Sequence, residues 1–243
     1  MFSPTADWVI EFSVWVVMVW VTYLVDYGAT KNIICPRWFQ RCCRREINFQ
    51  DGGMNIAHLS DTPLQRAHNF NFTTVLGILL WFSTTKQMFP IDDWEWWYII
   101  YPFVPAGAGL IFGYLGEFNG MDTACSLNSC PTWPWQSKLA YFFLGLAGAF
   151  GVGFNIYLAY EADFIGEYIA LLVGVPLYYL FQYLLFFVNR DVPTLHVHHW
   201  IIGYYAALMF RFPHPISRFF CLAAFGISIE GSVAYQLTTL FSN

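Results

Sequence analysis

Histidines and one carboxylate in the C-terminal third of the chain are the residues best suited to do chemistry. Residues 195–200 read Leu-His-Val-His-His-Trp and contain His196, His198 and His199, and Glu230 follows about thirty residues later. Imidazole nitrogens and carboxylate oxygens are common ligands of zinc and of non-haem iron. The sequence therefore predicts a metal site made by His196, His199 and Glu230, which His198 could complete if the first helical turn is distorted.

A helical hairpin would bring these groups together. If a helix capped by Asp191 or Thr194 carries the histidine run, His196 and His199 share one of its faces. The chain reverses at 212–215, which lies about 15 residues from His199 and about 15 residues from Glu230. At about 1.5 Å per residue, Glu230 and the histidines lie at the same depth.

A metal held in this way would bind a water of lowered pKa and would favour hydrolysis, with Glu230 and His199 as the catalytic residues. A further ligand could come from His58 or His68 in the preceding long connection, with Asp61 as a supporting carboxylate. Since the setting is a membrane, the substrate of such an enzyme would be a lipid. Zinc indicates hydrolysis, whereas iron indicates lipid oxidation.

The same residues allow other interpretations. Histidines at a membrane boundary can simply be polar residues that cap a helix. A carboxylate inside a span costs about 2.5–3.5 kcal/mol and normally faces the bundle interior with a partner. Glu230 is therefore also a candidate for a structural hydrogen-bonding residue or a proton-relay residue that needs no metal.

Two resemblances concern the histidines. The His-x-His-His run resembles the histidine boxes of membrane fatty-acid desaturases and hydroxylases, but this chain has too few histidines for their full di-iron set. Several spans with a few cytosolic histidines also resemble the membrane zinc hydrolases of the ceramidase and progestin-receptor kind, whose motifs this chain lacks. The sequence is assigned to no family on these grounds.

The elements that must position these residues are transmembrane helices. Hydrophobic residues make up 57% of the 243 residues and charged residues 11%, against about 25% charged in soluble domains. The net charge of −5 argues against nucleic-acid binding. Seven apolar segments approach the roughly 20 residues that a spanning helix needs, and they lie at about 8–27, 72–89, 94–116, 139–160, 164–188, 194–212 and 218–241.

The fold class expected is thus an all-α, multi-pass transmembrane bundle of about seven spans. The whole chain, 1–243, forms a single integral membrane domain with one long connection at about 29–71. The sixth segment has the shortest apolar core, so six spans with a re-entrant segment there is the alternative topology.

Basic residues set the expected orientation, because positive charge collects on the cytosolic side. Connections after the first, third and fifth spans carry eight of the eleven Lys and Arg residues, and the opposite side carries three. The N-terminus is then outside and the C-terminus is cytosolic. This orientation puts the histidine run and the connection at about 29–71 on the cytosolic side.

Small residues repeat at intervals of four in three of the segments, a pattern that lets helix backbones approach closely. The pattern predicts helix contacts within the bundle or with partner chains, and its members are Gly109 and Gly113, Gly145, Ala149 and Gly153, and Gly203 and Ala207.

Three functions stay open at this point. The first is a metal-dependent enzyme that acts on membrane lipids. The second is a non-catalytic subunit of a larger membrane complex. The third is a channel or transporter with Glu230 on its path, for which the sequence offers no internal repeat.

Overall fold

The structure is a computed structural model, and it describes residues 4–30, 63–83, 99–116, 135–188, 194–195, 199–235 and 241–242. The described part is almost entirely helical. Its helices are α1 (Pro4–Thr30), α3 (Pro63–Ser83), the 3-10 helix η3 (Tyr101–Phe103), α4 (Val104–Gly116), α5 (Trp135–Glu161), α6 (Ile165–Val188), α7 (His199–Met209) and α8 (Pro215–Tyr235). Two short strands, β1 (Thr194–Leu195) and β2 (Phe241–Ser242), pair antiparallel.

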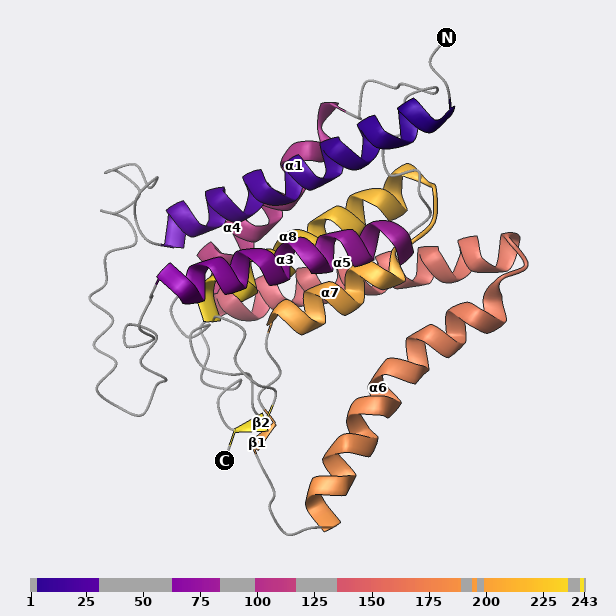
Figure 1. The fold of residues 1–243 in the computed structure, drawn as a ribbon. Helices are drawn as coiled ribbons and strands as arrows, with labels where there is room; N and C mark the ends of the chain where they lie inside the picture. The colour runs from indigo at the N-terminus through magenta and orange to yellow at the C-terminus, as the bar shows by residue number, and fades with distance from the viewer. Residues whose placement is uncertain are drawn as a thin grey trace.

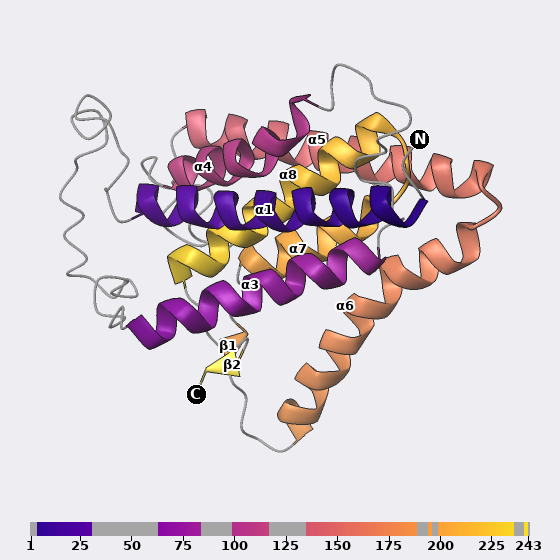
Figure 2. The same cartoon turned by 45° about the horizontal axis from the view of Figure 1, so that its top comes forward.

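Helix α8 is the centre of the bundle. Its most extensive contacts are with α7 and α4, followed by α1, and α1 also packs on α3. Figures 1 and 2 show these five helices gathered together, whereas α6 leads away from them toward its C-terminal end. The main core of the protein therefore lies among α1, α3, α4, α7 and α8.

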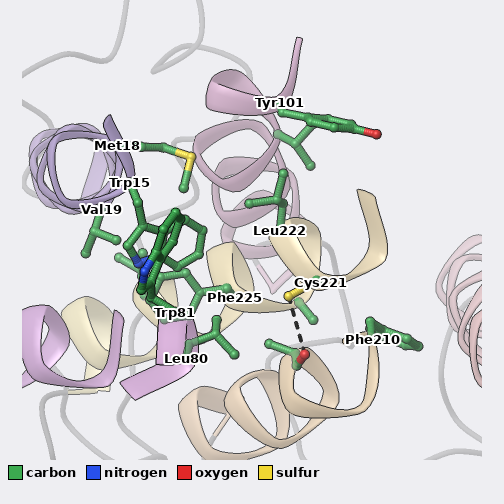
Figure 3. Packing of buried hydrophobic residues seen from close by; sticks show 14 of the residues in the cluster. Trp15, Met18, Val19, Leu80, Trp81, Tyr101, Phe210, Cys221, Leu222 and Phe225 are labelled. Carbon is green, nitrogen blue, oxygen red and sulfur yellow. Dashed lines mark hydrogen bonds between the residues drawn. The ribbon is translucent and has the colours of Figure 1, made fainter. Parts of the chain in front are cut away.

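Aromatic rings fill the space between α1, α3 and α8. The rings of Trp15 and Phe225 stack with centroids 5.6 Å apart, and Trp81 lies 6.0 Å from Trp15. All three side chains are fully buried, together with Leu222 (Figure 3). The indole N–H of Trp15 donates to the carbonyl oxygen of Gly77 at 2.8 Å, so the ring is buried without losing its hydrogen bond.

Three of the described helices are long and apolar enough to cross a bilayer, and these stretches are Trp8–Gly28, Lys138–Glu161 and Pro215–Val233. Shorter apolar stretches occur at Tyr101–Gly113, Ile165–Tyr178 and Trp200–Met209. The chain is thus a helical protein whose apolar helices are compatible with a membrane. The expected number of spans, seven or six, and their orientation stay predictions.

The helix boundaries predicted from the sequence agree best with the structure in the middle of the chain. Helix α6 (Ile165–Val188) begins one residue after the predicted start, and α5 contains all of the predicted 139–160 segment. Helix α3 begins at Pro63, nine residues before the predicted start at 72. Since proline fits the first turn of a helix, the amphipathic stretch after Pro63 extends the helix beyond its apolar part.

The sixth predicted span, 194–212, is where sequence and structure differ most. Thr194 and Leu195 form β1, and α7 begins only at His199. A helix of 11 residues is about 16 Å long, and the hydrocarbon core of a bilayer is about 30 Å thick. The last predicted span ends early for a related reason, because Phe241 lies in β2 and pairs with Leu195.

Candidate functional site

Glu230 lies on the face of α8 that is turned away from α7. On the opposite face, the hydroxyl of Ser228 donates to the carbonyl oxygen of Trp200 in α7 at 2.7 Å. The hydroxyl of Ser232 lies 3.1 Å from that of Thr73 in α3. A residue midway between two residues four apart points to the other side of a helix. Glu230 accordingly faces α4, and only 8% of it is exposed.

Gly113 of α4 is the point at which α4 meets Glu230. A Cβ atom at Gly113 would lie 3.0 Å from Oε1 of Glu230 and 3.4 Å from its Cδ. Such a contact is tighter than side chains normally make, so the glycine leaves the room that the carboxyl group occupies.

Asp26 of α1 enters the same part of the bundle from another side. It is 1% exposed. A Cβ atom at Gly109, one helical turn before Gly113, would lie 2.7 Å from Oδ2 of Asp26 and 3.0 Å from its Oδ1. Gly109 and Gly113 therefore lie over two different carboxyl groups, one from α1 and one from α8.

The two carboxyl groups act on each other. Gly109 and Gly113 lie one turn apart on α4, so the carboxyl groups of Asp26 and Glu230 that they face enter the same part of the bundle, where two ionised carboxylates would repel each other. Among the residues that the structure describes, none donates a hydrogen bond to either oxygen of Asp26 or to Oε2 of Glu230. Buried polar oxygens normally have a donor, so these three oxygens are an exception to be explained.

Helix α4 is held against α8 by direct backbone contact. A Cβ atom at Gly226 would lie 2.0 Å from the carbonyl oxygen of Pro105, which no side chain tolerates. The carbonyl oxygen of Gly226 in turn lies 3.0 Å from the position of a Cβ at Gly109. Close approach of the two backbones leaves no room for side chains larger than glycine at Gly226 and Gly109, beside the acid pair.

The predicted metal ligands are only partly within the described residues. His196, His198, His58 and Asp61 lie outside them, and His68 is exposed on α3. His199 is the first residue of α7. No group of three or more His, Cys, Asp or Glu side chains able to hold a metal occurs in the described part of the chain. The predicted site of His196, His198, His199 and Glu230 therefore stays a prediction.

One premise of that site is wrong. The prediction needs a single helix from about Thr194 that carries both His196 and His199, whereas Thr194 and Leu195 are paired with β2. Pro193 precedes this strand, and the β-branched residues around it favour extended backbone over a helical turn. The expected depth is right, since Trp200 of α7 lies opposite Ser228 of α8. Among the described residues, Gly113 of α4 lies against Glu230, and Asp26 lies against Gly109, one helical turn away on α4.

Asp26 is the residue that the sequence interpretation underrated, because it lies near the end of a predicted span where water is within reach. A usable signal does exist in the periodicity of α1. Trp15, Val19, Thr22 and Asp26 follow each other at intervals of three or four, and all four are buried. A polar residue that continues a buried stripe is expected to face the bundle.

Comparison with known proteins adds no relative, as no protein family, no curated protein and no solved structure matches this chain. The class is thus defined by the fold alone: a helical protein with apolar helices compatible with a membrane, which carries a buried pair of acidic residues.

Proposed function

We propose that this protein is an integral membrane protein that binds and releases a proton at Asp26 and Glu230, as a step in proton-linked transport. The observation that carries the proposal is the burial of both carboxyl groups, with three of their oxygens lacking any donor among the described residues. Inside a membrane protein, ionisable residues of this kind mark proton and ion pathways.

The energetics of the pair favour a bound proton. Two neighbouring carboxylates in a dry site repel each other, and burial disfavours each ionised form. One proton taken up by either carboxyl group removes this repulsion. Such a site holds a proton while it is buried and can release the proton when water reaches it. These are the properties of a proton carrier.

The place of the pair in the helices supports access from one side. Asp26 is two residues from the end of the Trp8–Gly28 stretch, and Glu230 is three residues from the end of Pro215–Val233. With α1 and α8 both ending on the cytosolic side, as the basic residues predict, the pair would exchange its proton with the cytosol. A route to the other face would then run along α1, α4 and α8.

Proton flux into liposomes tests this function. Purified protein is reconstituted into vesicles that contain a pH-sensitive dye, and an acid pulse is applied with the membrane potential clamped. Wild-type protein should acidify the interior faster than empty vesicles. Asp26→Asn and Glu230→Gln should each abolish the added flux, whereas Glu161→Gln, an exposed residue at the end of α5, should keep it. Equal flux in wild type and both pair variants would refute the proposal.

A second candidate is the non-catalytic subunit of a membrane complex. The observation in its favour is the small-residue face of α5, where a Cβ at Gly145 or Gly153 would meet nothing within 4 Å. Native mass spectrometry from mild detergent tests it. A complex with a defined second chain that dissociates in Gly145→Leu and Gly153→Leu, but not in Gly174→Leu, would support a subunit role. Gly174, on α6, likewise has no atom within 4 Å.

The metal-dependent lipid enzyme is tested by elemental analysis of the purified protein. About one zinc or iron ion per chain, lost in both Glu230→Gln and His199→Ala, would support the metal-dependent enzyme. Metal lost in His199→Ala but kept in Glu230→Gln would separate the histidines from the acid pair.

A further inference from the structure

We infer that the acid pair also binds a monovalent alkali cation, which exchanges with the proton. This inference rests on the proposed function, since it names a second ligand for the same site. The carboxyl oxygens of the pair accept hydrogen bonds, and both oxygens of Asp26 and Oε2 of Glu230 receive none from the described residues, as a cation site requires. Hard cations prefer oxygen ligands of this kind.

A further oxygen extends the site along α1. The hydroxyl of Thr22 is fully buried and has no hydrogen-bond partner among the described residues. Thr22 precedes Asp26 by four residues, so both side chains lie on the same face of α1, one turn apart. A threonine hydroxyl can coordinate a cation through its lone pairs. The unused hydroxyl therefore adds a neutral ligand beside two acidic ones.

A monovalent ion matches the proton in charge. The pair carries two negative charges when ionised, and one proton or one monovalent cation removes the same amount of that charge, so the two ligands can replace each other. On the packed helices, the other titratable or charged residues whose side chains the structure describes are Glu11, Tyr23 and Tyr27 of α1, Arg66 and His68 of α3, Tyr204 and Tyr205 of α7, and Arg218 and Cys221 of α8.

None of these groups supplies the missing positive charge. Arg66 donates to the hydroxyl of Tyr27 at 3.1 Å on the exposed side of α1 and α3. Arg218 lies twelve residues before Glu230 in α8, or about 18 Å along the helix. Within the described residues no positive charge is therefore placed at the pair, and we infer that one arrives with the ligand.

Divalent ions fit this site less well. Calcium takes six to eight oxygen ligands, and magnesium usually keeps several of its waters. The described site offers two oxygens from Asp26, one from Glu230 and the hydroxyl of Thr22, all of them buried. A monovalent ion has half the charge of either divalent ion, so four such oxygens suit it better.

Equilibrium binding of radioactive sodium to the full-length protein in nanodiscs tests the inference. Wild-type protein should bind about one sodium ion per chain. Its apparent Kd should rise by up to about tenfold per pH unit as the medium is acidified, because one proton competes with one ion. Asp26→Asn and Glu230→Gln should abolish binding, Thr22→Val should weaken it about three- to tenfold, and Glu161→Gln should bind as wild type does.

The outcomes separate the inference from the proposed function. If proton flux depends on Asp26 and Glu230 but wild-type protein binds no sodium, the inference is wrong and the proton function stands. If sodium binds at the pair and no proton flux occurs, the inference stands and the proton function fails. Binding that is insensitive to pH and to Thr22→Val, or that calcium displaces at lower concentration than sodium, would overturn the monovalent site.

Discussion

Two parts of the molecule differ in how tightly their helices pack: the part around α8 and the part formed by α5 and α6. Around α8, 72% of the apolar stretch Pro215–Val233 is buried, whereas in α5 only 11% of Lys138–Glu161 is buried. Helices α4 and α7 meet α8 through backbone contacts at Gly226 and Gly203. Helices α5 and α6 present mostly exposed apolar side chains, and α6 leads away from the bundle in both views (Figures 1 and 2).

This difference in burial distinguishes the part of the molecule that encloses a polar site from the part whose apolar side chains face the surroundings. In lipid, apolar burial gives little gain, so helix packing relies on small residues and hydrogen bonds. The α1–α4–α8 side has both, and it encloses Asp26 and Glu230. The α5–α6 side contacts the rest through one narrow face of α5 and the first turns of α6.

Substituting Trp15 with alanine should cause the largest loss of stability. The ring stacks on Phe225, contacts Trp81 and hydrogen-bonds to Gly77. Its loss leaves a cavity and removes one buried hydrogen bond, at a cost of about 3 kcal/mol or more. Reversible unfolding in mixed micelles measures the change. The control Leu24→Ala, at a position 59% exposed, should cost far less, and equal losses would mean that the aromatic core does not hold the bundle.

Gly226→Ala tests the backbone contact between α4 and α8. The new methyl group would overlap the carbonyl oxygen of Pro105, so the helices must separate, at about 1–3 kcal/mol. Gly153→Ala on α5 enters open space and should leave the unfolding free energy unchanged or slightly raised. A tolerated Gly226→Ala would show that the contrast between the two sides is not one of packing.

Ser217→Ala sharpens the comparison, because it removes the specific anchor of α5. The Ser217 hydroxyl donates to Oδ1 of Asn155 at 2.6 Å and accepts the N–H of Phe212 at 3.2 Å, all in buried surroundings. We expect a loss of about 1 kcal/mol, with faster proteolysis of α5. Ser13→Ala, which breaks a bond on an exposed face, should change neither, and similar effects of both variants would contradict a special role for Ser217.

A small pH dependence should come from His214, which precedes α8. Its Nδ1 accepts the N–H of Ile216 at 3.2 Å, and burial, followed by the charge of Arg218, holds its pKa below the usual 6.5. Because the folded pKa is lowered, the unfolded chain binds more protons. The His214 contribution is therefore complete above about pH 6.5 and is lost as the pH falls through the folded pKa.

Comparing thermal unfolding at pH 7.5 and pH 5.5 measures this term. The wild type should lose more stability on acidification than His214→Asn, because the asparagine side chain that replaces the acceptor of the Ile216 N–H does not titrate. An identical loss in the two proteins would assign the pH dependence to other groups.

Sequence reasoning located the helices better than it located the neighbours of the site. The apolar segments gave α5 and α6 almost to the residue, and Gly109 and Gly113 were expected to allow close approach, which they do at α1 and α8. The small-residue face of α5 was expected to pack in the same way, yet Gly145 and Gly153 face open space and Gly151 makes the contact.

The reason lies in what a one-dimensional pattern contains. The spacing of residues along the helix predicts the depth of Glu230 in the membrane and the face of α8 on which it lies. It does not predict which helix covers that face. The sequence predicts the histidines of the preceding helix as partners of Glu230, whereas the described residues place Gly113 of α4, distant in sequence, against it. The pairing of Leu195 with Phe241 is equally non-local, so the local preference for extended backbone after Pro193 does not reveal which segment pairs with it.

Infrared spectroscopy of the protonated carboxyl group tests the central claim most directly. Wild-type protein in lipid at neutral pH should show a carbonyl band of a protonated carboxylic acid that shifts little in heavy water, as expected for a buried group. The band should disappear or move in Asp26→Asn and in Glu230→Gln and stay unchanged in Glu161→Gln. A spectrum without this band at neutral pH, or one that neither pair variant alters, would contradict a shared proton at Asp26 and Glu230.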